Sequence, residues 1–264
     1  MTRLDLGWVC SSLARFVQYP GQAHMDIAMH ALAYLRFSVD KYIIYSRPSC
    51  ANDVNRLWGW VDADYAGCPD TRKSHTGYVL MLNGGTISWK SKRQSMVSLS
   101  SAESEYIAAG KCSQEVLYLR EILRGFNCKQ LQPTIIYEDN QACIAMSENQ
   151  VHRERSKHID VRKYFVRDLV EAKLLKLVPC NTKEMVVDAL TMSLAYPSFE
   201  MHRINSDGRL GVERFCAYPR QNEGGAFGFG EVKFHVIGGH RSSDTRTHLS
   251  TYSYTDTILG PYSY

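Results

Sequence analysis

Four acidic residues in this sequence lie where predicted secondary-structure elements begin or end, and their types suit the binding of divalent cations. They are Asp62, Glu105, Asp139 and Asp188. Carboxylates that converge repel one another, so such a group makes sense chiefly when cations lie between its members. Hard oxygen ligands that leave room for water and phosphate suit Mg²⁺ or Mn²⁺. Two such ions about 4 Å apart promote phosphodiester cleavage, which is the chemistry that these residues predict if the fold brings them together.

Two of these acids end predicted strands. Asp62 lies near the end of the stretch LWGWVDAD at 57–64, and Asp139 ends the stretch PTIIYED at 133–139. In an open α/β sheet, functional groups gather beyond the carboxyl ends of the parallel strands. If these two strands are adjacent and parallel, Asp62 and Asp139 converge there, with Glu105 above them.

Each of these acids also has a simpler structural interpretation. Aspartate is common where a strand ends in a turn, which would account for Asp62 and Asp64, and Asp139 could cap a following helix. Asp188 is one acid in a predicted helix at 182–195, and for it the simpler interpretation is the strongest of the four. Strand alternation does not separate Asp62 from Asp64, because both face the same side. We prefer Asp62 because it lies deeper in the strand pattern.

Glu105 lies on a long predicted helix at 99–124, LSSAESEYIAAGKCSQEVLYLREILR. The helix starts with a Ser-x-x-Glu capping box, in which the Ser100 hydroxyl accepts a backbone N–H and Glu103 reaches back to Ser100. At about 100° per residue, one sector collects the apolar stripe of Ala108, Ala109, Cys112, Val116, Leu119 and Leu123. Glu105 falls in the same sector. Because a carboxylate on an apolar stripe is costly, Glu105 either pairs with a buried Arg or Lys or holds a metal ion.

Length and composition describe an ordinary globular protein. The chain has 264 residues, 44% of them hydrophobic and 22% charged, and a formal net charge of +4, which is compatible with nucleic-acid binding without indicating it. The eight cysteines form no Cys-x-x-Cys pair, and the N-terminus lacks the layout of a signal peptide. No apolar run approaches the ~20 residues of a membrane span. We therefore expect an intracellular protein, in the cytoplasm or nucleus, without a membrane partner.

Periodicity and turn residues predict an α/β fold that positions the acids. From residue 57 the predicted order is three strands, a helix, a strand, two helices, a strand and a helix. The predicted strands lie at 57–64, 76–82, 86–90, 133–139 and 174–178, and the helices at 99–124, 140–147, 152–173 and 182–195. Asn83-Gly84-Gly85 is a strong hairpin signal between the second and third strands. The flanking regions are predicted as helices at 5–18 and 22–38, a strand at 41–45, a linker at 46–56 and a poorly ordered extension at 205–264.

Several motifs, in this order, resemble the ribonuclease H domain of copia-type retrotransposon polyproteins. They begin with VDAD and SAESEYIAA within 61–109 and continue with YEDNQACIAM at 137–146, RSKHIDVRKYFVRDLVE at 155–171 and VDALTM at 187–192. The resemblance covers about residues 57–200. The first 45 residues are similar to the end of the adjoining reverse transcriptase, notably SSLARFVQYPGQAHMDIAMHALAYLR. The Tyr-x-Asp-Asp motif of the polymerase does not occur, so we expect no DNA synthesis.

This resemblance implies an α/β, RNase H-like fold: a five-stranded mixed sheet, three antiparallel strands and then two parallel ones, flanked by helices. The implied parts are a helical remnant of the reverse transcriptase at 1–45, a linker at 46–56, the RNase H-like domain at 57–204 and the extension at 205–264. The family's catalytic and metal-binding acids fall on Asp62, Glu105, Asp139 and Asp188. These acids would hold two Mg²⁺ ions, with Mn²⁺ as a possible substitute.

The last motif departs from the family pattern. The family usually reads Ala-Asp-x-Leu-Thr-Lys, whereas this chain has Val187 and Met192 at the two ends of the motif. Tyr65 and Cys68 likewise stand where the family usually has Trp and Asp. These changes alter the surroundings of Asp188 and remove none of the four acids.

The resemblance also suggests a function for basic residues, which could contact the two phosphate backbones of an RNA–DNA hybrid. They are Lys90, Lys92 and Arg93 after the third strand, and Arg155, Lys157, His158, Arg162 and Lys163 in the basic stretch. An A-like hybrid is recognised through its backbone shape and 2′-OH groups, so no base-reading motif is required. For any one of these residues, a solvated charged surface is an equal alternative. His158 matches a family motif, but its role is not assigned by the sequence.

Three functions remain open at this point. The first is a Mg²⁺-dependent, two-metal ribonuclease that cleaves the RNA strand of an RNA–DNA hybrid, working with the remaining polyprotein segments. The second is an inactive remnant that keeps the fold and at most binds nucleic acid, which the altered last motif favours. The third is an integrase or transposase on the same fold, which the order of the motifs disfavours.

Overall fold

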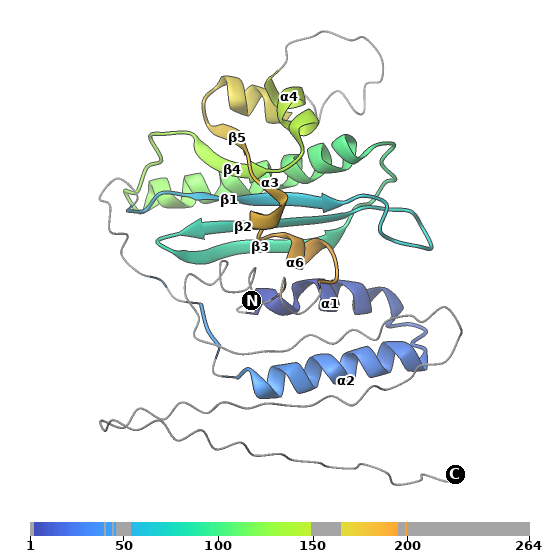
Figure 1. Cartoon of the computed structure of the whole chain (residues 1–264). Coiled ribbons are helices and arrows are strands. Elements are labelled where there is room, and N and C mark those ends of the chain that lie inside the picture. Colours follow the sequence, from blue (N-terminus) through green and yellow to red (C-terminus); the bar gives the residue numbers. More distant parts are fainter. Residues whose placement is uncertain are drawn as a thin grey trace, which may run out of the picture. The chain divides into compact units, whose positions relative to one another are not determined.

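The computed structural model describes residues 3–39, 41–43, 45, 54–148, 165–194 and 199. The chain divides into two units, Met1–Tyr218 and Pro219–Tyr264, and all described residues belong to the first. The predicted linker at 46–56 lies mostly, and the predicted extension at 205–264 entirely, outside the described residues. The predicted domain boundaries therefore stay predictions. Within the first unit, helices pack around a central sheet (Figure 1).

The sheet has five strands and is mixed. The strands are β1 Trp58–Asp64, β2 His75–Leu82, β3 Gly85–Arg93, β4 Thr134–Glu138 and β5 Leu175–Pro179. Their order is β3-β2-β1-β4-β5; the first three strands are antiparallel, β4 runs parallel to β1, and β5 runs parallel to β4. This topology confirms the predicted α/β, RNase H-like fold. It also confirms that the first and fourth predicted strands are parallel neighbours.

The turn between β2 and β3 follows from its sequence. Asn83 and Gly84 have φ values of 50° and 75°, and the flanking residues Leu82 and Gly85 are paired. Two consecutive positive φ values are typical of a type I′ turn, for which Asn-Gly is the favoured pair. The hairpin is confirmed, but β3 is longer than predicted. It continues to Arg93, so the basic residues expected after the third strand lie within it.

The long helix α3, Ser101–Gly125, packs on β1 and β2 and forms one layer over the sheet. The Ser100 hydroxyl accepts the N–H of Glu103, as predicted, whereas the Glu103 carboxylate accepts the N–H of Leu99 instead of Ser100. Its predicted apolar stripe faces the sheet, fully buried except for the half-buried Leu119. This face packs with Val61, Leu80 and Ile136 of the sheet in the larger apolar cluster. The helical wheel therefore gave the correct buried face.

The opposite face of the sheet is covered by residues 4–16 near the N-terminus and by residues 185–191, which follow the last strand. Helix α1, Gly7–Leu13, lies between the 3-10 turns Leu4–Leu6 and Ala14–Phe16 and packs on β3 and on the short helix α6, Asp188–Thr191. A second apolar cluster fills this layer, with Leu4, Trp60, Val79, Met185 and Leu190 among its members. Two layers thus bury both faces of the central strand β1.

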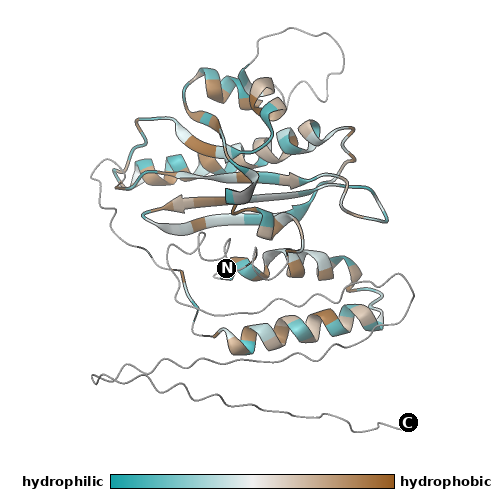
Figure 2. Cartoon of the chain, viewed as in Figure 1, coloured by the Kyte–Doolittle hydropathy of each residue, from teal (hydrophilic) through white to brown (hydrophobic). Residues whose placement is uncertain are grey.

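Helix α2, Gln22–Phe37, is less buried than the others. Hydrophobic and hydrophilic residues alternate along the helix (Figure 2), and Met29, Leu32 and Phe37 are exposed. None of the described helices combines the length and the apolar character that a membrane crossing requires.

Two predicted elements differ from the structure among the described residues, and two others agree with it. Residues 41–43 and 45 are not in a strand; Tyr45 contacts β3 through its hydroxyl, which donates to the carbonyl of Thr86 at 2.7 Å. The predicted helix at 152–173 is described only at 165–171, where it is helical, and the short predicted helix at 140–147 is α4, Gln141–Glu148.

The second difference is the predicted helix at 182–195, which is instead a 3-10 turn, Thr182–Glu184, followed by α6. Met185, Val186 and Val187 are buried one after another. The four residues of α6 are buried as well, so the whole stretch from Met185 to Thr191 lies in the core. A segment buried on all sides lacks the one-sided pattern by which a surface helix is recognised in a sequence.

Candidate metal centre

The parallel pairing of β1 with β4 brings two of the predicted acids together. The register aligns Trp60 of β1 with Tyr137 of β4. Asp62 and Asp139 each follow that pair by two residues, so they lie level at the carboxyl ends of neighbouring strands. Asp62 is buried and Asp139 is half-buried.

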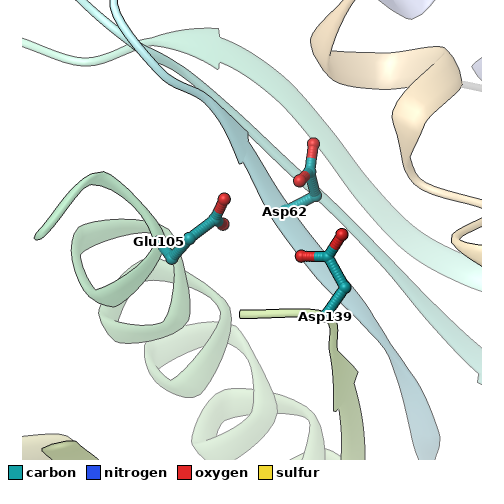
Figure 3. A group of neighbouring side chains, drawn as sticks. All are labelled: Asp62, Glu105 and Asp139. Atoms are coloured by element: carbon teal, nitrogen blue, oxygen red, sulfur yellow. The ribbon is translucent and has the colours of Figure 1, made fainter. Parts of the chain in front are cut away.

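Glu105 approaches this pair from helix α3. It lies in the second turn of the helix, on the face that packs against the sheet, and is 5% exposed. Asp62, Glu105 and Asp139 each offer one carboxylate oxygen, and these three oxygens lie within 4.8 Å of one another. Figure 3 shows the three side chains converging from β1, α3 and the end of β4. The arrangement is a compact group of three carboxylates at one edge of the core.

The donor set fits a hard divalent cation. The Oε2 atom of Glu105 is buried and has no hydrogen-bond partner among the described residues. No Arg or Lys in the described part of the chain forms an ion pair with Glu105, and the charges that act on it come from Asp62, Glu138 and Asp139. Burial and these charges raise its pKa well above the ordinary range. Within the described residues, the alternative of a buried basic partner therefore finds no support.

Asp188 lies beside this group but is not one of the three. It is the first residue of α6, is 9% exposed, and has a pKa raised to about 7 by burial and by the charges of Asp62 and Asp139. Burial likewise raises the pKa of Asp62 to about 6, against the opposing hydrogen bond from Thr191. The Thr191 hydroxyl links the two residues, because it hydrogen-bonds to both the Asp62 carboxylate and the backbone carbonyl of Asp188. All four predicted acids thus gather on one side of the molecule.

The structure also distinguishes Asp62 from Asp64. Strand alternation alone gave no preference between them, because both side chains face the same side of the strand. Asp64 is half-buried and does not join the group of three. Its carboxylate instead lies over the backbone of Gly67, in the loop after β1: a Cβ built on Gly67 would lie almost on top of Asp64 Oδ2. Asp62 is therefore the acid of this strand that faces Glu105 and Asp139.

Sequence reasoning missed a fifth carboxylate, Glu138. It is fully buried, its Oε1 accepts the N–H of Asn140 at 3.1 Å, and its Oε2 has no partner among the described residues. Burial and the nearby charges of Asp62 and Asp139 raise its pKa. Strand alternation could have indicated that Glu138 is buried, because it shares a face of β4 with Thr134 and Ile136, both of which are buried. An acid on this buried face is unusual for a strand whose other residues are mostly apolar.

Two threonines that sequence reasoning also missed donate hydrogen bonds to the acids. The Thr191 hydroxyl donates to Asp62 Oδ2 at 2.5 Å, and the Thr182 hydroxyl donates to Asp139 Oδ2 at 2.9 Å. The first contact is buried and the second is exposed. Both partners come from distant parts of the chain, so local sequence patterns contain no signal for them.

Some of the predicted basic residues lie at the same end of the sheet as the acids. The β-ladders connect Ala63 of β1 to Thr76 of β2 and Thr76 to Lys92 of β3. Two strand spacings separate β3 from β1, about 10 Å. Lys92 is exposed, whereas Lys90 and Arg93 are half-buried, and Arg93 Nη1 donates to Cys68 Sγ at 3.6 Å. Arg155, Lys157, His158, Arg162 and Lys163 lie outside the described residues.

The raised carboxyl pKa values predict an unusual dependence of stability on pH. A carboxyl with a higher pKa in the folded than in the unfolded chain binds more protons when folded, so the free energy of unfolding falls as the pH rises between the two values. For Asp62 and Asp188 this range runs from 3.8 to about 6 and about 7. We expect urea unfolding in EDTA to give a lower stability at pH 8 than at pH 5, and Mg²⁺ to stabilise the protein more at pH 8. Equal stability at both pH values would contradict this prediction.

Curated relatives of the chain are mostly transposon polyproteins. The chain is 36% identical over 200 residues to the retrovirus-related Pol polyprotein from transposon TNT 1-94 of Nicotiana tabacum, which covers 76% of this chain and 15% of the relative. It is 30% identical over 213 residues to the corresponding polyprotein from transposon RE1 of Arabidopsis thaliana, covering 81% of this chain and 14% of the relative. The chain thus spans about one seventh of the length of these polyproteins. No family model matches it.

A shorter relative and several solved structures are also similar. Secreted RxLR effector protein 161 of Plasmopara viticola is 37% identical over 119 residues, covering 45% of this chain and 81% of that protein. The structure of LC11-RNase H1, isolated from compost, has a TM-score of 0.39 and 13% identity, covering 52% of this chain and 94% of that one. The protease-reverse transcriptase of prototype foamy virus has a TM-score of 0.36 and 11% identity, covering 64% of this chain and 22% of that one.

Proposed function

The chain belongs to the Pol polyprotein family of copia-type retrotransposons, and we propose that residues 57–204 form a ribonuclease H domain that cleaves the RNA strand of RNA–DNA hybrids. The observation that carries this proposal is the convergence of Asp62, Glu105 and Asp139, whose ligand oxygens lie within 4.8 Å of one another. A buried carboxylate group with no basic ion-pair partner among the described residues suits Mg²⁺ or Mn²⁺.

In this proposal, the residues that would hold two ions are Asp62, Glu105, Asp139 and Asp188. The chemistry that a bound pair supplies is the activation of water and the stabilisation of the leaving oxygen in phosphodiester cleavage. The contribution of the chain is to orient the ligands. The register of β1 and β4 sets Asp62 and Asp139 level, and α3 brings Glu105 to them. Burial of Asp62 and Glu105 lowers the local dielectric constant, which strengthens their interaction with a cation.

Basic residues at the acidic end of the sheet would bind the substrate. Lys92 is exposed, and it lies about 10 Å across the sheet from β1, in the row of Thr76 and Ala63. A cation there is suitably placed to neutralise a backbone phosphate while the acids act elsewhere on the duplex. Contacts of this kind recognise the shape of the hybrid and its charge, not its base sequence.

The proposal is tested by incubating the purified full chain with an RNA–DNA hybrid that carries a label on the RNA strand, in Mg²⁺ or Mn²⁺. We expect metal-dependent cutting of the RNA that EDTA stops. An Asp139→Asn variant should lower the rate roughly 10³-fold, because losing a ligand removes several kcal/mol of charge stabilisation and each 1.4 kcal/mol is a factor of ten. Asp26→Asn, the same substitution at an exposed position of α2, is the matched control and should cut normally.

Other outcomes favour the alternative functions. A folded protein that binds the hybrid and cuts nothing would overturn the nuclease and leave an inactive remnant. Strand transfer on duplex DNA without cleavage of hybrids would instead favour an integrase or transposase.

A further inference from the structure

The Asp62 carboxylate is held by a side chain that lies 129 residues further along the chain. The Thr191 hydroxyl donates to Asp62 Oδ2 at 2.5 Å, and both residues are buried. The carbonyl oxygen of Asp188, in the same helix, lies 3.2 Å from the same hydroxyl. A hydroxyl carries one proton, and a bond to a carboxylate is stronger than one to a neutral carbonyl. Thr191 therefore directs its proton to Asp62.

This contact depends on a glycine in the neighbouring strand. Gly77 of β2 is paired with Asp62 across the ladder. A Cβ at position 77 would lie 2.6 Å from Thr191 Cγ2 and 3.0 Å from Val187 Cγ2, and the former distance is one that real Cβ atoms do not tolerate. The absence of a side chain at Gly77 thus lets α6 approach the sheet directly beside Asp62. A methyl group at this position would force the Thr191 side chain or the helix that carries it to shift.

The rest of α6 is anchored independently of the acids. Leu190 is fully buried in the apolar cluster that contains Trp60 and Val79. Its carbonyl oxygen accepts a hydrogen bond from the Ser91 hydroxyl of β3 at 2.7 Å. The helix is therefore held to the sheet by its neighbours, and its position fixes the Thr191 hydroxyl in front of Asp62. The first residue of the same short helix is Asp188.

We propose that Thr191 is a positioning residue that orients the Asp62 carboxylate toward Glu105 and Asp139. The absence of a side chain at Gly77 allows Thr191 to reach this position. The inference rests on the proposed metal-dependent function of the same acids. Hydrogen bonds that orient the ligands of a metal commonly change its affinity 10- to 100-fold. One short helix thus supplies an acid and also the donor that orients a second acid. Thr191 itself binds no ion and touches no substrate in this arrangement.

The test compares Mn²⁺ affinity, measured by isothermal titration calorimetry on the purified full chain, between wild type and three variants. Thr191→Val keeps the volume and removes the hydroxyl, and we expect it to weaken Mn²⁺ binding about 10-fold. Thr191→Ser keeps the hydroxyl and should bind close to wild type. Thr134→Val is the matched control, because Thr134 is equally buried but lies at the other end of β4, where its hydroxyl accepts from Arg120. It should leave Mn²⁺ affinity unchanged.

A second measurement is hybrid cleavage, for which Thr191→Val should lower kcat and leave the KM for the hybrid unchanged. Gly77→Ala keeps the hydroxyl but displaces α6, so it should weaken Mn²⁺ binding in the same way. Wild-type affinity in Thr191→Val, or equal losses in Thr191→Val and Thr191→Ser, would overturn the positioning role. If wild type binds Mn²⁺ but cuts no hybrid, the proposed function fails, while the affinities still decide the role of Thr191. A wild-type chain that binds no Mn²⁺ overturns both.

Discussion

Replacing Glu105 by Gln is expected to lower the rate of metal-dependent cleavage by orders of magnitude and, at the same time, to stabilise the metal-free protein. The carboxyl is buried beside Asp62, Glu138 and Asp139, and its pKa is raised by burial first and by these charges next. Above its ordinary pKa, the folded chain must either keep this group protonated or keep a charge buried, and both cost free energy. Gln has nearly the same shape and no charge, so it removes that cost.

The expected gain in the free energy of unfolding is on the order of 2 kcal/mol at pH 8, the size that a displaced carboxyl pKa commonly contributes to stability. At pH 5, close to the ordinary pKa, the gain should nearly vanish. Urea unfolding in EDTA at both pH values measures it. The loss of cleavage should be roughly 10³-fold, since the amide cannot replace a charged ligand.

The matched control is Glu121→Gln, on the outer face of the same helix. Glu121 is exposed and pairs with Arg124 one turn away, and exposed pairs of this kind contribute little. This variant should change neither cleavage nor stability by a measurable amount. If Glu105→Gln still cuts the hybrid, Glu105 is not a ligand. If it loses both cleavage and stability, the loss of activity reflects a damaged fold and not a missing ligand.

Replacing Gly59 by Ala is expected to give the largest loss of stability of any single methyl group added to this sheet. Gly59 lies in the central strand β1, paired with Leu80 of β2 on one side and Ile136 of β4 on the other. A Cβ there would lie 2.1 Å from the carbonyl oxygen of Val79 and 2.9 Å from Leu80 Cδ2. The first neighbour is backbone in a β-ladder, so it cannot move aside without breaking the pairing of β1 with β2.

We expect Gly59→Ala to lower the free energy of unfolding by about 3 kcal/mol or more, at the upper end of what overpacking costs. Chemical denaturation at one pH and in EDTA measures this. The control is Gly110→Ala in helix α3, where the nearest atom to a new Cβ is Val166 Cγ2 at 3.8 Å. Because glycine disfavours a helix interior, this change should stabilise the protein by roughly 0.5–1 kcal/mol. A mild effect of Gly59→Ala, similar in size to that of Gly110→Ala, would contradict the packing of β1 on β2.

The two glycine variants test two different effects: a steric clash of the new methyl group and a change in the conformational freedom of the backbone. At Gly59 the decisive quantity is the distance to a fixed neighbouring strand, whereas at Gly110 it is the entropy of the unfolded chain. Gly77 resembles Gly59 in this respect, because its missing side chain makes room for α6. Glycine in the strands of this sheet therefore controls how closely neighbouring elements approach.

Local sequence determined much of the fold. The apolar strand segments, the Asn83-Gly84 turn and the apolar stripe of the helix at 101–125 are properties of residues within a few positions of one another, so they could be predicted without the structure. The same holds for Glu105, whose place on the buried stripe follows from the helical repeat. The family motifs then suggested which acids belong together, and the parallel pairing of β1 with β4 brings Asp62 and Asp139 level.

Tertiary structure decided what depends on contacts between distant segments. Strand parity does not distinguish Asp62 from Asp64, and the structure brings only Asp62 into the group with Glu105 and Asp139. The short helix α6 and the buried residues before it pack against a sheet formed by much earlier residues, so the local sequence pattern did not predict where the helix begins and ends. Thr191 meets Asp62 across 129 residues, a pairing that no local period encodes. Local sequence therefore predicted most of the elements, because their patterns span only a few residues. Packing decided which side chains meet and how they are oriented, because that depends on which distant elements come together.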